Sequence, residues 1–105
     1  DKTASNIGSN TTTTSTGSAG ETTAANEYLV AVMSCLSPGT LDNNLTSPTN
    51  GFTEQEGYIN NWTSPINGGG AGSYLDKIVS AIGTYSTGLT SANTGYFAGC
   101  IVTLK

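Results

Sequence analysis

The chain has 105 residues, too few for more than one domain, and only 35% of them are hydrophobic, so its core must be thin. Three lysines, no arginine and no histidine give a net charge of −4, which excludes the basic surface that nucleic acids or anionic membranes require. The many Gly, Ser, Thr and Asn residues are typical of a β-rich or loop-rich secreted domain.

The N-terminal segment is polar and of low complexity, with the stretch SNTTTTSTGSAG at its centre. Such a sequence buries too little apolar surface to offset the entropy that is lost on ordering. We therefore expect residues 1–21 to be a flexible linker or a segment ordered by a partner, and residues 22–105 to form the globular domain. The segment has neither a basic start nor an apolar run, so we expect no signal peptide in it; if the protein is secreted, as its two cysteines imply, Asp1 is a processed N-terminus.

The segment TTAANEYLVAVMSCLSPG is expected to form a helix of about four turns. Its apolar residues fall at i, i+1, i+4, i+5 and i+8, which makes one helical stripe: Tyr28, Leu29, Val32, Met33 and Leu36. Thr22 or Thr23 can cap the start of this helix, and Ser37-Pro38-Gly39 ends it.

Turn signals recur from Thr40 to Gly72, in SPTNG, TSPING and GGGAG, and predict a long loop region. After it, SYLDKIVSAIGTY fits a helix by its apolar spacing and a strand by its β-branched residues. The final segment TGYFAGCIVTLK is apolar and β-prone, which predicts a closing strand. With TYSTGLTSAN between them as another short strand and turn, the last third is expected to be an antiparallel meander.

The two cysteines, Cys35 and Cys100, indicate one disulfide and therefore an oxidising compartment outside the cytoplasm. In the chain-entropy model, closing a loop of this length stabilises the fold by roughly 4 kcal/mol. The alternative is a pair of buried free thiols, which the secreted-type composition disfavours.

The chain offers little for catalysis or metal binding. Glu54 and Glu56 form a candidate carboxylate pair, but no histidine or arginine supports them, so a solvated turn is favoured. No serine has a histidine base, NGGGAGS lacks the Lys-Ser/Thr of a phosphate-binding loop, and Asp42 alone is too little carboxylate for calcium. We expect no enzyme activity, no metal and no cofactor.

Two segments resemble the globular half of type IV pilins. SYLDKIVSAIGTYSTG is similar to the first strand of pilin heads, which follows a Gly-rich loop, and GYFAGCIVTLK is similar to the closing strand that carries the second pilin cysteine. The similarity spans roughly residues 22–105 and favours a strand over residues 74–82. The chain lacks the long apolar pilin helix, and it most resembles the large globular subunit of the split, two-chain pilins of metal-reducing bacteria.

This resemblance implies an α+β fold: a pilin-like head with one N-terminal helix, a long loop region and a C-terminal antiparallel meander. It also implies a structural subunit that docks on a short helical pilin chain, contacts neighbouring copies in a helical filament and is found outside the cell or in the periplasm. A role in cytochrome secretion is favoured over electron conduction, because the eight aromatic residues are dispersed and no haem motif is present. The candidate partner interface comprises Tyr28, Leu29, Val32, Met33 and Lys77.

An alternative interpretation is a secreted, monomeric carbohydrate-binding or adhesin-like module. In that case Phe52, Tyr58 and Trp62 are the candidate stacking residues for a sugar. A binding module should be stable alone, whereas a filament subunit should be marginal without its partner.

Overall fold

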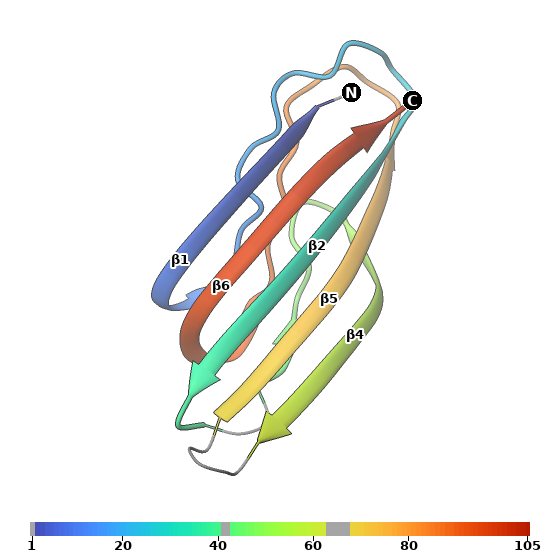
Figure 1. Ribbon diagram of the computed structural model, residues 1–105. Coiled ribbons are helices and arrows are strands. Elements are labelled where there is room, and N and C mark those ends of the chain that lie inside the picture. The colour runs from blue at the N-terminus through green and yellow to red at the C-terminus, as the bar shows by residue number, and fades with distance from the viewer. Residues whose placement is uncertain (1, 41–42, 63–67) are drawn as a thin grey trace.

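The computed structural model describes residues 2–40, 43–62 and 68–105, apart from the side chain of Trp62 (Figure 1). The chain forms one antiparallel sheet of six strands in the order β1-β6-β2-β5-β4, and the short β3 pairs with β6 away from this path. The strands are β1 (Thr3–Thr13), β2 (Glu27–Pro38), β3 (Leu45–Thr46), β4 (Thr53–Trp62), β5 (Gly68–Val79) and β6 (Thr90–Leu104).

The expected α+β fold with an N-terminal helix is wrong, because the described part of the chain is all β. Residues 27–38, which were expected to be helical, form β2 at the centre of the sheet. β2 pairs with β5 along all twelve of its residues and with β6 along nine. This pairing on both sides outweighs the helical spacing of the stripe. No helix in the described ranges is long and apolar enough to cross a membrane.

One face of the sheet is covered by a rear layer of extended segments, which Figure 1 shows behind the strands. Residues 14–22 run antiparallel to residues 83–89, with the Thr14 amide donating to the Leu89 carbonyl at 2.8 Å and the Thr16 amide to the Thr87 carbonyl at 2.9 Å. The core lies between this layer and the sheet: Ala19, Leu29, Ala31, Met33, Cys35, Leu45, Phe52, Ala71, Leu75, Val79, Leu89 and Ile101. The hydroxyls of the threonine-rich segments satisfy backbone groups in the rear layer. The Leu89 amide, for example, donates to Thr14 Oγ1 at 2.9 Å.

The N-terminal segment, which was expected to be flexible or ordered only by a partner, is ordered within this chain. Residues 3–13 form the edge strand β1, and residues 14–22 belong to the rear layer. Backbone pairing orders this polar sequence, because a strand ladder needs no apolar side chains.

Two strand expectations for the C-terminal half are confirmed, but the short strand expected between them and the meander are wrong. β5 covers most of residues 74–82, and β6 contains the predicted closing strand. β5 and β6 are not neighbours, because β2 lies between them, and residues 80–89 cross behind the sheet instead of forming a short strand in it. The predicted long loop region contains β3, β4 and the start of β5, so the glycines at 68–70 and 72 are strand residues.

Candidate interaction surface

The second face of the sheet is not covered by any described segment, and we call it the open face. Strand residues alternate between the two faces, so β2 buries Leu29, Ala31, Met33 and Cys35 in the core while its other residues lie on the open face. The registers with β6, β5, β1 and β4 extend this assignment across the sheet. The open face carries Ser5, Ile7, Tyr28, Val30, Val32, Ser34, Leu36, Glu56, Tyr58, Gly70, Gly72, Tyr74, Asp76, Ile78, Tyr96, Ala98, Cys100, Val102 and Leu104.

The open face is strongly apolar. Nine large hydrophobic side chains of the described chain are exposed, and only Ile59 and Ile82 lie elsewhere. The other seven are on the open face: Ile7, Val32, Leu36, Tyr58, Ile78, Tyr96 and Leu104. The exposed fraction is 81% for Ile7 and 78% for Ile78, which lie towards opposite edges of the sheet. Patches of this extent on a soluble chain mark interaction sites.

The size of the face fits a stable interface. The molecule measures 49 × 22 × 17 Å, and the open face spans the two long dimensions, so its footprint is on the order of 1,000 Å². A standard protein interface buries about 800 Å² on each partner. The described acidic residues on this face are Asp76 and Glu56, and it carries no described lysine, so a partner that covers it should place no carboxylate beside these two residues.

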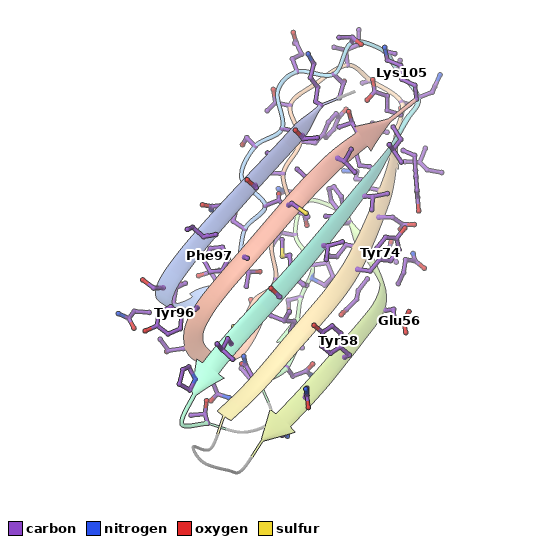
Figure 2. The ribbon with its side chains drawn as sticks, viewed as in Figure 1. Glu56, Tyr58, Tyr74, Tyr96, Phe97 and Lys105 are labelled. Atoms are coloured by element: carbon purple, nitrogen blue, oxygen red, sulfur yellow. The ribbon has the colours of Figure 1, made fainter. Side chains whose placement is uncertain are left out.

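A groove of about 370 Å³ crosses one end of the open face. Its walls include Tyr58, Leu36 and Tyr96, and its floor includes the small residues Ser34 and Gly70. Figure 2 shows Tyr58 on β4 and Tyr96 on β6, with β2 and β5 between them. The Tyr58 ring lies over Gly72, where a Cβ atom would be 2.1 Å from the ring, so Gly72 is required for this ring position. A second hollow of about 270 Å³ lies beside the groove, between Ile7, Val32, Ala98 and Cys100.

A polar cluster lies toward the other end of the open face. The Tyr28 hydroxyl donates to Asp76 Oδ2 at 2.5 Å and lies 3.0 Å from the Tyr74 hydroxyl, while Gln55 Nε2 donates to Asp76 Oδ1 at 2.8 Å. The hydrogen bond to Asp76, and then the one to Tyr74, raise the pKa of Tyr28 above its ordinary value. These bonds give each oxygen of the Asp76 carboxylate an uncharged donor, which solvates its negative charge without cancelling it.

The structure divides the five predicted interface residues between the two faces. Tyr28 and Val32 lie on the open face, while Leu29 and Met33 are buried in the core. Lys77 lies on the rim of the covered side, where its Nζ donates to the Asn50 carbonyl at 2.6 Å and is 5.8 Å from the centre of the Phe52 ring. The helical interpretation placed Tyr28 and Leu29 on one face, but successive residues of a strand point to opposite faces.

The expected disulfide is absent, since both cysteines are free. Cys35 is opposite Phe97 on the covered side, and Cys100 is opposite Val32 on the open face. The two are three residue pairs apart along the ladder, or about 10 Å, on opposite faces of the sheet. A disulfide needs Cα atoms within about 7 Å and Cβ atoms that point toward each other. The Cys35 thiol instead lies 3.5 Å from Ser91 Oγ in the core.

The carboxylates considered for catalysis or calcium do not converge. A register shift between Glu54 and Glu56 places Glu54 opposite Leu75 on the covered side and Glu56 opposite Tyr74 on the open face. Glu54 accepts a hydrogen bond from Ser73. Asp42 lies outside the described residues, and among those described no group of three or more His, Cys, Asp or Glu side chains could hold a metal ion.

The signal for the open face is present in the sequence of β2. The run YLVAVM is apolar at every position, which is typical of a strand buried on both faces. This structure covers one side of that run and leaves the other exposed. Comparisons of the chain with protein-family models, with curated proteins and with solved structures give no match.

Proposed function

We propose that this chain is a structural subunit of an extracellular or periplasmic filament, and that its open face docks on a partner chain. The observation that carries the proposal is the apolar open face, which gathers seven of the nine exposed large hydrophobic side chains. A domain normally buries each apolar sheet face against a second layer. Here one layer comes from the chain itself, and the proposal assigns the other to the partner.

The partner that the pilin resemblance implies is a short apolar helical chain of a type IV pilus or pseudopilus-like filament. The open face suits such a partner in three respects: it is apolar, it carries no described lysine, and it is 49 Å in its long dimension. That dimension equals roughly 30 residues of α-helix at 1.5 Å per residue. The helix once expected within this chain plays no part in the proposal, which depends on the sheet face alone.

The test compares matched variants of two exposed hydrophobic residues. Val32 is 49% exposed at the centre of the open face, and Ile82 is 56% exposed after the end of β5, outside that face. We expect Val32→Glu to abolish co-purification with the partner chain and incorporation into filaments, because it places a charge in the apolar interface. Ile82→Glu should assemble like the unaltered chain, since it lies away from that interface.

Ile78→Glu provides a second open-face variant at a position that is 78% exposed, where a charge costs little folding stability. Assembly of both open-face variants at normal levels would contradict the proposal. In the secretion role, deletion of the chain should abolish cytochrome export, and unchanged export would refute that role. Four of the five tyrosines lie on the open face, Tyr58 and Tyr96 beside the groove and Tyr28 and Tyr74 in the polar cluster, so they are less dispersed than the sequence alone suggests.

The groove between Tyr58 and Tyr96 favours a second candidate function, a sugar-binding or adhesin-like module. Aromatic walls over a floor of small residues suit the stacking of a neutral sugar ring. Of the other two residues predicted for this role, Phe52 is buried on the covered side, and the side chain of Trp62 lies outside the described residues. This function predicts a stable monomer whose glycan binding is lost in both Tyr58→Ala and Tyr96→Ala.

A further inference from the structure

β1 is hydrogen-bonded to the sheet along one side only, and Gly17 of the rear layer lies close to Ser5 and Asn6. β1 lies at the edge of the sheet, and β6 is its hydrogen-bonded neighbour (Figure 1). No residue from Thr3 to Thr13 is buried, and the core cluster includes none of them, although Ala4 packs against it. β1 therefore contributes a backbone ladder to the fold and little of its core.

The front part of β1 nevertheless binds β6 in one defined register. Six consecutive residues, Thr3 to Gly8, pair with Val102 to Phe97 without interruption. Gly8 lies against the Phe97 ring, and a Cβ atom at this position would be 2.1 Å from Phe97 Cε1. A shift by one residue would bring the side chain of Ile7 or Ser9 to that position, so the ring selects the register.

A bend separates this front part from the rear layer. The β1–β6 register shifts between Gly8 and Thr11 and again between Thr11 and Thr13, and Asn10 has a φ of 54°, in the left-handed region. From Thr14 onward the chain is held by the rear layer, where the Thr14 amide donates to the Leu89 carbonyl. Residues 9–12 are thus the hinge about which the front part of β1 can turn, and Ala4 is the residue of this part that packs against the core.

We propose that β1 is exchanged between copies of this chain, so that residues 3–8 of one copy pair with β6 of the next. An exchanged strand makes the same six residue pairs and the same Gly8–Phe97 contact as the strand it replaces, so the exchange loses no contact. The strand that leaves one copy enters a different surface on the next, and such a heterologous contact continues into an open chain of copies. This contact lies at the sheet edge, so it goes beyond the proposed function and needs no partner on the open face.

The exchange can be tested with a disulfide across the β1–β6 ladder. Ser5 is directly opposite Cys100, and both are exposed on the open face. Residues opposite each other in an antiparallel pair have Cα atoms about 4.5–5.5 Å apart, within the range of a disulfide. Oxidation of the Ser5→Cys variant therefore joins β1 covalently to whichever copy it pairs with.

The Ser5→Cys chain is unfolded, refolded at high concentration, oxidised and separated by non-reducing denaturing electrophoresis. We expect a ladder of dimers and larger multimers. Oxidation of a 1:1 mixture of the Ser5→Cys/Cys100→Ser chain with the unaltered chain should give a mixed dimer, because that disulfide can form only between copies. Monomer with an internal disulfide at every concentration, and no mixed dimer, would overturn the proposal.

Two controls fix the interpretation. Asn6→Cys points to the other face, opposite Gly99, and should give no more multimer than the unaltered chain. The unaltered chain forms disulfide-linked dimers only through contact between two exposed Cys100 residues, and this dimer fraction is subtracted from the fraction found for the Ser5→Cys chain.

A hinge variant tests the mechanism of exchange. Proline cannot adopt the φ of 54° found at Asn10, so Asn10→Pro should straighten the hinge and raise the multimer fraction several-fold in the Ser5→Cys background. Asn10→Gly accommodates the bend and should leave the multimer fraction unchanged. An Asn10→Pro chain that stays monomeric, with an internal disulfide joining position 5 to Cys100, would count against the hinge and the exchange alike.

Discussion

Leu29 and Val32 lie in one helical stripe of the sequence but on opposite faces of β2, and truncating each tests which description is correct. Leu29 is fully buried, in contact with the core between the sheet and the rear layer. Leu29→Ala removes most of a buried aliphatic side chain and leaves a cavity, at a cost of about 2–5 kcal/mol. The matched change Val32→Thr keeps the β-branched shape at a position that is half exposed, and should cost less than about 0.5 kcal/mol.

The difference is large compared with the stability of the chain. A domain of this length has an unfolding free energy of roughly 5–15 kcal/mol, so Leu29→Ala removes a substantial part of it. With a urea m-value of about 2 kcal/mol/M, the midpoint of unfolding should fall by about 1–2.5 M for Leu29→Ala. Urea titration followed by circular dichroism gives both midpoints. Equal losses for Leu29→Ala and Val32→Thr would refute the assignment of these two residues to opposite faces.

Three further predictions concern the rear layer, the cysteines and the response to pH. Gly88→Ala should destabilise the chain by about 1–3 kcal/mol, because its Cβ would lie 2.4 Å from the Thr14 carbonyl oxygen, whereas Gly20→Ala has room and should be near neutral in thermal unfolding. A thiol reagent should modify Cys100 in the native chain and Cys35 only after unfolding, with two thiols in total, and an intact mass two hydrogens below the reduced value would contradict this. Because the pKa of Tyr28 is raised in the folded chain, this residue stabilises the fold fully at pH values below its unfolded-state pKa of about 10. The contribution is lost as the pH rises above that value, because the Tyr28 hydroxyl loses its proton at a lower pH in the unfolded chain than in the folded chain. Urea unfolding above about pH 10 should therefore show a steeper loss of stability for the unaltered chain than for Tyr28→Phe, and parallel curves would contradict the Tyr28–Asp76 bond.

The closing strand was predictable because its signal is local. Residues 94–105 combine apolar and β-branched residues with no competing pattern, and all of them but Lys105 belong to β6. The residues of segment 74–82 left both a helix and a strand possible, and the pilin resemblance favoured the strand. β5 covers most of this segment. Both segments are strands in the structure, although their order in the sheet was not predictable, since it depends on pairing with β2.

The helix prediction failed at β2 because it used only part of the apolar run. A stripe containing Tyr28, Leu29 and Val32 leaves out Val30 and Ala31, although these are equally apolar. A continuous apolar run fits a strand with both faces covered as well as it fits a helix, and local spacing cannot separate the two. β5 on one side of β2 and β6 on the other decide that this segment is a strand, so its secondary structure is set by tertiary pairing and not by local sequence.

The candidate site was predictable only in part, for the same reason. Tyr28 and Val32 were identified, but most of the open face comes from four other strands that the sequence does not place beside β2. The glycines of GGGAG illustrate the difficulty. They have the composition of a flexible loop, yet in β5 Gly70 lies in the floor of the groove and Gly72 lies beneath the Tyr58 ring.

The most direct test of the account is the reactivity of Cys100 in assembled material. Cys100 is exposed at the centre of the open face, and Cys35 is buried in the core, so the chain carries both a reporter of docking and an internal control. We predict that alkylation of Cys100 is slow in filaments and becomes fast when the chain is separated from them, while Cys35 stays unreactive in both states. Equal alkylation rates of Cys100 before and after separation would contradict the claim that a partner covers the open face.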